Sequence, residues 1–295
     1  MKYLYYPGCS LKSTAKAFEE SLLAVMAGLD VPVEELNDWN CCGSASYLAI
    51  DEKQAYALAA RNLALAEEQD TSNPGAPVEL MVPCAACYLV LNKAQHYIEE
   101  SPEIASVVTG ALADVGLKYS GRVRVRYPLD IMLNDLGLDR IKAKVQRPLK
   151  GLKVACYYGC QIMRPYAFFD DQHNPTSMDR TLAAMGADVV DWPLKIRCCG
   201  SLLTGTIEEI GLDLGHVLLK EARKRGADVI ATACPLCHFN LECYQGKINH
   251  RKNDDLAMPV VFFTQLMGLA MGIPEQKLGL QRQIVPVGRV LAAVS

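Results

Sequence analysis

Ten of the twelve cysteines in this 295-residue chain follow one pattern that occurs twice. Each copy has a single cysteine after a glycine, then an adjacent cysteine pair followed by glycine, then a Cys-x-x-Cys motif. The first copy consists of Cys9, Cys41, Cys42, Cys84 and Cys87. The second consists of Cys160, Cys198, Cys199, Cys234 and Cys237. Five thiols per copy exceed what core packing or one tetrahedral metal ion requires, and they indicate iron–sulfur chemistry.

Zinc sites and disulfides are the two other uses of clustered cysteines. A structural zinc site is usually closed by four ligands, and the side chains of adjacent cysteines diverge too far to chelate one small ion. Disulfides would leave the adjacent pairs in awkward bridges, and they are rare in reducing compartments. In a cluster, by contrast, adjacent cysteines can bind different irons, or one of them can bridge. Clusters are therefore the favoured interpretation.

Four residues near the cysteines are candidates for a direct part in the chemistry. His238 directly follows Cys237, where it could donate a hydrogen bond to a cluster sulfur or protonate a leaving thiol. Lys12, Arg164 and Lys195 lie close in sequence to cysteines of the pattern. They could neutralise a negatively charged cluster or bind an anionic substrate. The alternative for each is an ordinary solvated side chain on the surface.

Glycines flank the cysteines in both copies. They are expected to let the backbone pass close to an inorganic core, and they are Gly8, Gly43, Gly159 and Gly200. Two cysteines lie outside the pattern, Cys156 and Cys243. Both are expected to be buried core thiols and not ligands.

The overall composition narrows the class of protein. The net charge is −3 and the isoelectric point is about 6.0, so the chain has no bulk attraction for nucleic acid or anionic membranes. No signal peptide is evident, and the longest apolar run, residues 260–273, is interrupted and too short to span a bilayer. The expectation is a soluble cytoplasmic protein, with enough apolar residues, 51%, for two cores.

The elements that must position the cysteines also repeat. Short apolar runs predict strands over 2–6, 79–82, 153–158 and 228–232, and helical spacing predicts helices over 14–29, 52–68, 177–185 and 207–225. This alternation predicts an α/β fold of two pseudo-symmetric duplicated domains, 1–148 and 149–295, each a small parallel sheet with flanking helices. The single cysteine and the Cys-x-x-Cys motif follow strands, and ligand sites gather at the carboxyl ends of parallel strands.

The stretch from Cys41 to Cys87, repeated from Cys198 to Cys237, resembles the cysteine-rich CCG domain. A chain of two such domains resembles the B subunit of heterodisulfide reductase and its bacterial relatives. The resemblance covers nearly the whole chain, including Tyr158-Gly159-Cys160. The opening residues Tyr5-Tyr6-Pro7-Gly8-Cys9 are more similar to those of bacterial and sulfur-metabolism relatives.

The resemblance implies a specific set of cofactors and partners. Each five-cysteine set would hold a non-cubane four-iron cluster, and a disulfide would bind between the two clusters and be cleaved there. Electrons would arrive through a C subunit that carries cubane iron–sulfur clusters, from a flavin-containing A subunit. A substrate such as the coenzyme M–coenzyme B heterodisulfide is anionic, so Lys12, Arg164 and Lys195 are the candidates for binding it.

Two alternative functions remain. The chain could be a non-catalytic electron-transfer subunit that passes electrons from a flavin subunit to a different terminal enzyme. It could also be a binding module with two zinc sites, which the adjacent cysteine pairs argue against. The first alternative uses the same ligands as the catalytic hypothesis, so the sequence does not separate the two.

Overall fold

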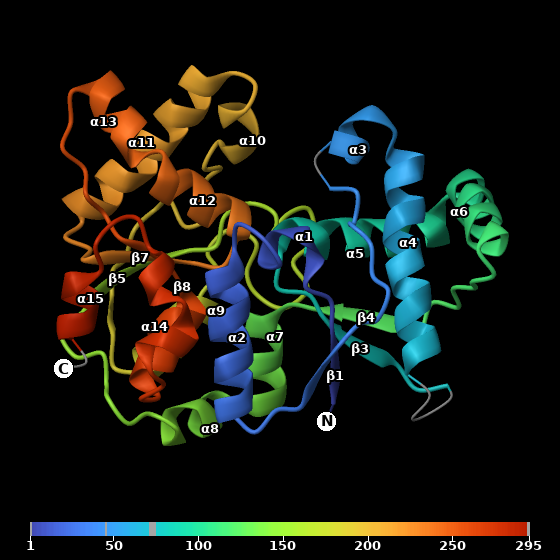
Figure 1. Cartoon of the computed structure of the whole chain (residues 1–295), viewed down its shortest axis with the longest axis horizontal. Helices are drawn as coiled ribbons and strands as arrows, with labels where there is room; N and C mark the ends of the chain where they lie inside the picture. The colour runs from blue at the N-terminus through green and yellow to red at the C-terminus, as the bar shows by residue number, and fades with distance from the viewer. Residues whose placement is uncertain (1, 45, 71–74, 294–295) are drawn as a thin grey trace. The chain divides into compact units, whose positions relative to one another are not determined.

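The computed structural model describes residues 2–44, 46–70 and 75–293, and it contains two four-stranded parallel β-sheets. The chain divides into two compact units. Unit 1 comprises residues 1–12 and 31–128, and unit 2 comprises residues 13–30 and 129–295. Helices accompany each sheet, as parallel strands require for their crossover connections (Figure 1).

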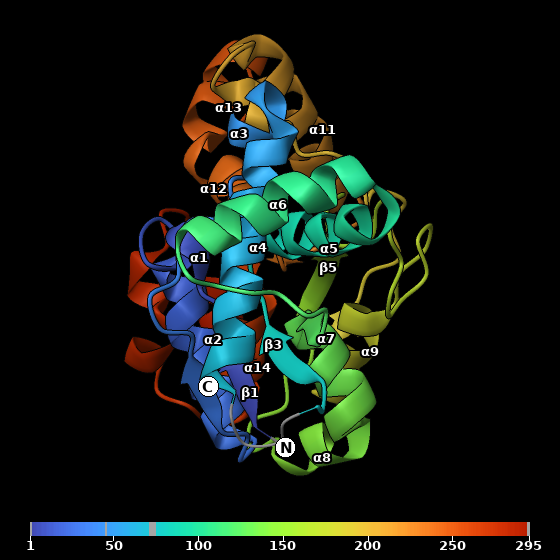
Figure 2. The same cartoon turned by 90° about the vertical axis from the view of Figure 1, so that its right-hand side faces the viewer.

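Unit 1 is built on a sheet with the strand order β2-β1-β3-β4. Its strands are β1 (Tyr3–Tyr5), β2 (Val33–Glu35), β3 (Val78–Met81) and β4 (Val123–Arg126). Its helices are α1 (Gly8–Leu11), α3 (Ser46–Ile50), α4 (Glu52–Gln69), α5 (Ala85–Glu100) and α6 (Pro102–Asp114). Helices α4, α5 and α6 pack against one another, as Figure 2 shows. The short helix α7 (Pro128–Asp130) lies where the chain passes from unit 1 into unit 2.

Unit 2 repeats this sheet with the order β6-β5-β7-β8. Its strands are β5 (Lys153–Tyr157), β6 (Asp188–Val189), β7 (Val229–Thr232) and β8 (Val260–Phe262). Its helices are α2 (Lys16–Gly28), η1 (Ile131–Leu136), α8 (Leu138–Ala143), α9 (Ser177–Ala184), α10 (Ser201–Thr204), α11 (Glu208–Lys224), α12 (Pro235–Cys243), α13 (Gln245–Lys252), α14 (Phe263–Ala270), η2 (Glu275–Leu278), η3 (Leu280–Arg282) and α15 (Gly288–Ala292).

The predicted fold class and its main elements are confirmed. Each of the four strands expected from apolar runs is present, and each boundary differs from the expected one by at most one residue. The four expected helices are also present, as α2, α4, α9 and α11. Local signals explain two of the helix starts. The carboxylate of Asp51 caps α4 by accepting the backbone N–H of Lys53 at 3.0 Å, and Pro235 occupies the first turn of α12.

The compact units differ from the contiguous halves expected from the sequence. Residues 13–30, which belong to the first half, pack in unit 2, as do residues 129–148. The predicted boundary at residue 148 separates the two copies of the sequence repeat, and as a domain boundary it stays a prediction. It does not describe which segments pack together.

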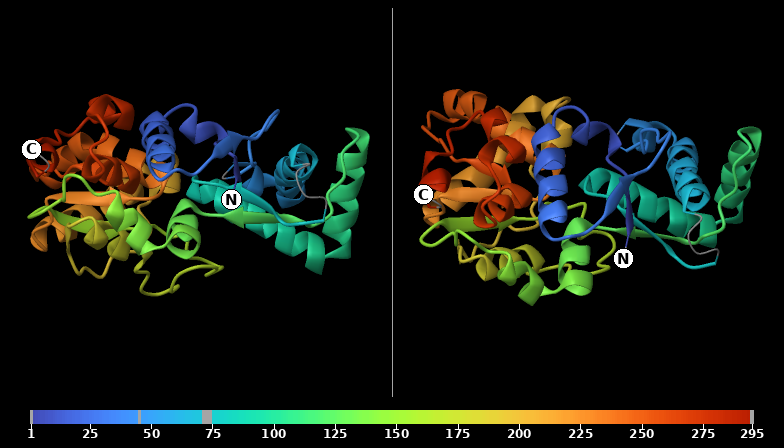
Figure 3. Two further views of the ribbon diagram at one scale, coloured as in Figure 1. Left: turned by 90° about the horizontal axis from the view of Figure 1, so that it is seen from below. Right: turned by 60° about the horizontal axis from the view of Figure 1, so that its bottom comes forward.

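Helix α2 packs in unit 2 because it presents an apolar face there. Its buried residues recur at helical spacing, and they include Phe18, Leu22 and Val25. The Phe18 ring stacks on Phe262, with centroids 4.5 Å apart and an interplanar angle of 3°. Figure 3 shows α2, in blue, beside the red C-terminal segment that contains α14. A buried hydrogen bond of 2.6 Å joins the hydroxyls of Ser21 and Thr264 across this contact.

No helix within the described ranges is both long and apolar enough to cross a membrane.

Replacing the buried ring of α2 tests this packing. We expect Phe18→Ala to lower the free energy of unfolding by about 3–5 kcal/mol, because it removes a fully buried phenyl ring and leaves a cavity beside Phe262. The matched control is Phe168→Ala, because Phe168 is 59% exposed and should lose less than about 1 kcal/mol. Urea unfolding followed by circular dichroism measures both. Equal losses in the two variants would show that α2 is not part of the core of unit 2.

Candidate functional site

The five cysteines of each copy converge because three neighbouring strands end at the same edge of a sheet. In unit 1, Cys9 follows β1, the Cys41–Cys42 pair follows β2, and Cys84 follows β3. Strands β2 and β3 are the two neighbours of β1 in a parallel sheet, so all three carboxyl ends meet. The predicted placement of the single cysteine and the Cys-x-x-Cys motif after strands is confirmed.

Unit 2 repeats the arrangement around β5, whose neighbours are β6 and β7. In both units the central strand is also the point where the order of connections reverses, because the chain adds a strand on one side and then on the other. Parallel α/β sheets bind their ligands at such switch points. Cys9 and Cys160 lie directly beyond these two strands.

The glycine before each single cysteine allows a close approach of thiol and backbone. Gly8 and Gly159 have φ of +66° and +73°, which side chains disfavour. A Cβ atom at Gly8 would lie 2.8 Å from the Sγ of Cys87, and one at Gly159 would lie 3.0 Å from the Sγ of Cys237. The expected role of these two glycines, to keep side chains away from the sulfur-rich centre, agrees with this geometry.

The glycines after the adjacent pairs also make close contact with a helix. A Cβ at Gly43 would lie 3.1 Å from the Cα of Ala55 on α4, and a Cβ at Gly200 would lie 2.9 Å from the Cα of Gly211 on α11. The position that a Cβ atom would occupy at these glycines is therefore next to the long helix that follows. Each glycine lets the loop with the adjacent pair pack closely against that helix.

The thiols within each set differ in solvent exposure, and the pattern is similar in the two sets. The first cysteine of each adjacent pair is exposed and the second is buried, and both Cys-x-x-Cys motifs are buried. Cys9 is exposed and Cys160 is partly exposed. In unit 2 the sulfurs of Cys199 and Cys237 lie 3.5 Å apart. Each set therefore has a buried side and an edge that small molecules in solution can reach.

Backbone N–H groups point at sulfur in both units. The N–H of Ser44 donates to the Sγ of Cys42 at 3.4 Å, and the N–H of Gly200 donates to the Sγ of Cys198 at 3.4 Å. Such donors stabilise negative charge on sulfur, and they are a standard means of tuning iron–sulfur centres.

The pKa values show that the thiols act on one another as a set. A hydrogen bond with Cys41 raises the pKa of Cys9, and hydrogen bonds from Cys42 and Cys9 lower the pKa of Cys41. In unit 2, a hydrogen bond with Cys198 raises the pKa of Cys160, and the same bond lowers the pKa of Cys198 to about 6. These opposite shifts place the thiols within hydrogen-bonding reach of one another, and a lowered pKa favours the thiolate, the form that binds metal.

Hydroxyl groups that the sequence analysis did not single out also reach the thiols. The pKa of Cys84 is lowered by a hydrogen bond from the Cys87 thiol, by nearby backbone N–H groups and, to a smaller extent, by Ser10. The pKa of Cys199 is lowered by the Cys237 thiol and, to a smaller extent, by Ser201. The tyrosine hydroxyls of Tyr6 and Tyr157 are buried beside each set, and this burial raises their pKa. The signal that could have found the tyrosines is their repeated position three residues before the single cysteine.

His238 lies on α12 and is engaged away from the thiols. Its Nε2 is 2.7 Å from Oε2 of Glu242, a carboxylate that is almost fully buried. Its ring stacks on Phe262 with centroids 4.2 Å apart. Glu242 in turn accepts the backbone N–H groups of Ile284 and Val285. The ring of His238 thus packs α12 on β8, and Glu242 binds α12 to the C-terminal segment.

Lys195 is also held inside the fold. It is 8% exposed, and its Nζ lies 2.6 Å from Oδ1 of Asp179. The other carboxylate oxygen of Asp179 accepts the hydroxyl of Tyr158 at 2.6 Å. The carbonyl oxygen of Lys195 accepts the backbone N–H groups of Tyr158 and Gly159, which lead into Cys160. Lys195 therefore holds the loop that leads into Cys160 through its backbone carbonyl.

The two remaining basic candidates differ in their surroundings. The Nζ of Lys12 lies 2.7 Å from Oε2 of Glu35, an ion pair at the surface of unit 1. Arg164 is exposed and donates to the carbonyl oxygen of Ile196 at 2.6 Å. Its charge contributes to lowering the pKa of Cys198, after hydrogen bonds from Cys160 and Gly200. Arg164 thus combines exposure with an electrostatic effect on a thiol of the pattern.

The two cysteines outside the pattern lie in contrasting environments. Cys156 is fully buried on β5, as expected, and burial raises the pKa of its thiol. Cys243 was expected to be buried, but it is exposed at the end of α12. The prediction was wrong because the residue faces outward at the last turn of the helix, where helical spacing no longer indicates burial.

The donor sets suit a group larger than a single ion. Among the described residues, which include all twelve cysteines, no three or more Cys, His, Asp or Glu side chains are placed to hold one metal ion. Each set nevertheless brings five soft sulfur donors together, with N–H donors and glycine-lined approaches around them. Soft ligands spread over several contact points fit a multi-iron cluster better than a tetrahedral zinc ion.

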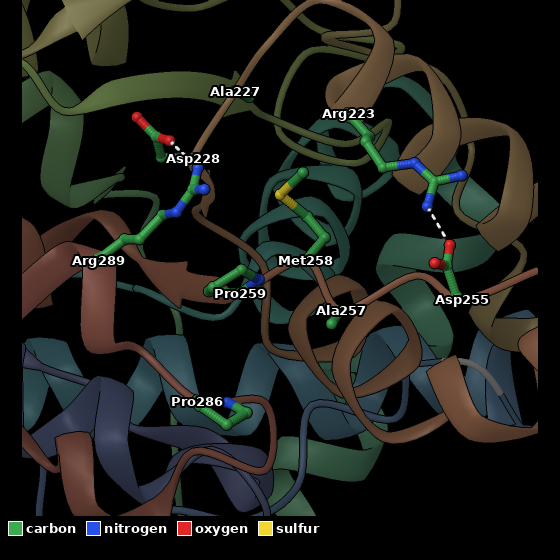
Figure 4. A pocket seen from close by; sticks show the side chains of 9 residues that line it. All are labelled: Arg223, Ala227, Asp228, Asp255, Ala257, Met258, Pro259, Pro286 and Arg289. Atoms are coloured by element: carbon green, nitrogen blue, oxygen red, sulfur yellow. Dashed lines mark hydrogen bonds and ion pairs between the residues drawn. The ribbon is translucent and has the colours of Figure 1, made fainter.

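A cavity of about 460 Å³ lies elsewhere in unit 2 (Figure 4). Its lining includes Asp228, directly before β7, and Pro259, directly before β8, so it lies at the amino ends of these two strands. The carboxyl end of β7, which leads to Cys234, is at the opposite edge of the sheet. The two arginines that line it are paired, Arg223 with Asp255 and Arg289 with Asp228. Its charged groups thus neutralise one another, and it shares no residue with the thiol set.

Comparison with known proteins finds the same family of domain in both halves of the chain. The profile of the CCG family, described as Cysteine-rich domain, matches residues 3–92 and 154–242. The chain is 30% identical over 286 residues to the 8-methylmenaquinol:fumarate reductase membrane anchor subunit of Wolinella succinogenes, with 96% of this chain and 97% of the relative covered. It is 27% identical to the B subunit of the ferredoxin/F420H2-dependent CoB-CoM heterodisulfide reductase of Methanosarcina acetivorans, with 99% and 97% covered.

Two further similarities complete the comparison. A protein of Archaeoglobus profundus, named as similar to the B subunit of heterodisulfide reductase, is 28% identical, with 94% of this chain and 93% of the relative covered. The crystal structure of a hypothetical protein from Helicobacter pylori superposes with a TM-score of 0.75 at 17% identity, covering 98% of this chain and 52% of the other. At that identity the structural match supports the fold alone.

Two glycines of unit 2 offer a matched test of the site's backbone. Gly200 has φ of +84°, and a Cβ there would lie 2.9 Å from backbone atoms of Gly211. We expect Gly200→Ala to lower the free energy of unfolding by about 2 kcal/mol or more. Gly205→Ala is the control, because its φ is −86° and it has open space around it, so it should be neutral or stabilising by up to about 1 kcal/mol. Thermal unfolding that shifts equally in both would contradict the packing described for Gly200.

Proposed function

Because the chain belongs to the family of proteins built from CCG cysteine-rich domains, we propose that it is an iron–sulfur redox subunit equivalent to the B subunit of heterodisulfide reductase. One observation carries the proposal. Both units gather five thiols at the carboxyl ends of three neighbouring parallel strands, in the same order around the central strand. A zinc-binding module would not need five thiols per unit.

Each five-cysteine set would hold one non-cubane four-iron cluster. The ligands in unit 1 would be Cys9, Cys41, Cys42, Cys84 and Cys87, and those in unit 2 would be Cys160, Cys198, Cys199, Cys234 and Cys237. A bound cluster supplies one-electron redox chemistry and Lewis acidity at iron. Burial of the Cys-x-x-Cys motifs excludes water from one side of each set, and the exposed Cys41 and Cys198 leave the other side accessible.

The reaction that we propose is the reduction, or the reverse formation, of a small disulfide. Cleavage of one S–S bond consumes two electrons and two protons and yields two thiols, and two one-electron centres in one chain provide that number. The duplication of the thiol set is thereby explained. Electrons would arrive from the cubane iron–sulfur C subunit and the flavin-containing A subunit of a multi-subunit complex.

The candidate substrate-binding residues receive unequal support from their contacts. Arg164 is exposed and close enough to Cys198 to influence its pKa, so it is our first candidate for binding an anionic substrate such as the coenzyme M–coenzyme B heterodisulfide. Lys12 is already paired with Glu35, and Lys195 is buried with Asp179. His238 is paired with Glu242, so proton donation from it would require a change of partner.

A specific observation favours a second candidate function. The relative at 30% identity is named as a subunit of a fumarate reductase, whose substrate is not a disulfide. The chain would then pass electrons between a flavin subunit and a different redox partner without binding a disulfide. Both functions use the same two thiol sets, so they differ only in what reacts at the exposed edge of each set.

Anaerobic turnover separates these two functions. The purified chain is reduced with a viologen and supplied with candidate disulfides, and oxidation of the viologen is followed. The proposal predicts disulfide-dependent oxidation that Arg164→Ala slows mainly by raising KM, because the arginine binds substrate and does not hold the cluster. Iron-loaded chain that shows no oxidation with any disulfide would favour the electron-transfer function.

Removing one ligand from each set tests the cluster assignment. We expect Cys42→Ser and Cys199→Ser each to lose or convert one cluster while the other set keeps its own, since each set lies within one unit. Iron and acid-labile sulfide analysis with EPR measures the loss. Cys243→Ser is the control, because Cys243 is exposed and outside both sets, and it should retain the iron content of the parent chain. Unchanged iron in Cys42→Ser and Cys199→Ser would contradict the ligand assignment.

Removal of the metal should also lower stability. Ligand thiols brought together without metal repel one another once ionised, so metal binding and folding are coupled. We expect the chain to unfold at a lower temperature after anaerobic chelation, as measured by circular dichroism. An apo protein with an undiminished thermal midpoint would argue against a cofactor held by both sets.

A further inference from the structure

Tyr6 and Tyr157 occupy the same position in the two copies, the third residue before the single cysteine. Tyr157 is the last residue of β5, and Tyr6 directly follows β1. Both side chains are completely buried. Each lies at the carboxyl end of the central strand of its sheet, between the two neighbours whose carboxyl ends lead to the other thiols.

The hydroxyls of both tyrosines make the same hydrogen bond. The hydroxyl of Tyr6 donates to the carbonyl oxygen of Asn40 at 2.7 Å, and that of Tyr157 donates to the carbonyl oxygen of Arg197 at 2.5 Å. Asn40 and Arg197 are the residues immediately before the adjacent cysteine pairs. In both units, therefore, one hydroxyl ties the start of the paired cysteines to the strand that leads into the single cysteine.

The only two tryptophans of the sequence hold the tyrosine rings in place. Tyr6 meets Trp39 edge to face, with centroids 5.8 Å apart, and Tyr157 meets Trp192 at 6.0 Å. The indole N–H of Trp192 donates to the carbonyl oxygen of Cys156 at 2.9 Å. The two copies differ in how each indole is anchored, but both place an aromatic partner against the tyrosine.

Each tyrosine also lies beside the second cysteine of the Cys-x-x-Cys motif. The hydroxyl oxygen of Tyr157 is 4.0 Å from the Sγ of Cys237. In unit 1, a Cβ at Gly8 would lie 2.8 Å from the Sγ of Cys87 and 3.6 Å from the ring of Tyr6, so ring and sulfur flank the same glycine. Each tyrosine thus lies on the segment that leads into the single cysteine, bonds to the residue before the adjacent pair and lies beside the Cys-x-x-Cys motif.

We propose that Tyr6 and Tyr157 are positioning residues, whose hydroxyls fix the spacing of the cysteine pair relative to the other thiols of each set. The inference rests on the proposed function, because the spacing matters for a group held by all five sulfurs. Ring packing alone would be satisfied by phenylalanine, whereas a bond to a main-chain carbonyl needs the hydroxyl. Loss of the hydroxyl removes one tie between the strand and the loop that begins at Asn40 or Arg197, and it leaves the carbonyl of that residue without this donor.

The test compares Tyr6→Phe and Tyr157→Phe in the full chain purified without oxygen. Each substitution should shorten the half-life of one cluster under challenge with a chelator by about three- to tenfold, the equivalent of one hydrogen bond. It should also shift the EPR signal and the midpoint potential of that cluster, while the cluster of the other unit stays as in the parent chain. Tyr56→Phe is the control, because Tyr56 is a buried tyrosine whose hydroxyl bonds to Glu52 at 3.3 Å.

The outcomes are distinguishable. Parent chain that holds no iron would overturn the proposed function itself. Iron-loaded parent chain with unchanged spectra and half-lives in both tyrosine variants would overturn the positioning role and leave the cluster assignment intact. Loss of native circular dichroism in both variants would also overturn it, because the hydroxyls would then be required by the whole fold. Matching changes in Tyr56→Phe would show that any buried tyrosine hydroxyl has this effect.

Discussion

The site depends on the side-by-side ending of three parallel strands. A parallel sheet forces neighbouring strands to finish at one edge, so segments separated by tens of residues deliver their next residues to one place. In unit 1 this brings together Cys9, the Cys41–Cys42 pair and the motif that begins at Cys84. The left-handed backbone of Gly8 then lets the thiols approach, since no side chain fills the centre. Which thiols come together is therefore decided by which strands are neighbours in the sheet, and not by their distance in the sequence.

The two sets share this plan but differ in what supports them. In unit 2, a buried ion pair between Lys195 and Asp179 holds the hydroxyl of Tyr158, and two backbone N–H groups bind the Lys195 carbonyl. Pro7 stands at the position of Tyr158 in unit 1, and proline has no N–H to donate. The loop of Cys160 is therefore cross-linked to its surroundings in a way that the loop of Cys9 cannot match.

The sequence predicts the parts of the structure that depend on local pattern. The strands, the long helices and the convergence of the cysteines within each set follow from periodicity, spacing and duplication. Other features depend on long-range contacts that no single segment encodes. Helix α2 packs in unit 2 because Phe262 and Thr264 complement its face, and these lie more than two hundred residues away. Gly43 and Gly200 leave room for the following helices, and Lys195 and His238 have carboxylate partners inside the fold.

We propose that each set of five thiols holds one multi-iron cluster. Mössbauer spectroscopy of the chain reconstituted with ⁵⁷Fe under anaerobic conditions tests it most directly, because it counts iron environments in both sets at once. We expect spin-coupled, sulfur-coordinated iron in clusters of one type, with two clusters per chain by iron content. A spectrum of isolated mononuclear iron, or a chain that takes up zinc and excludes iron under the same conditions, would contradict it.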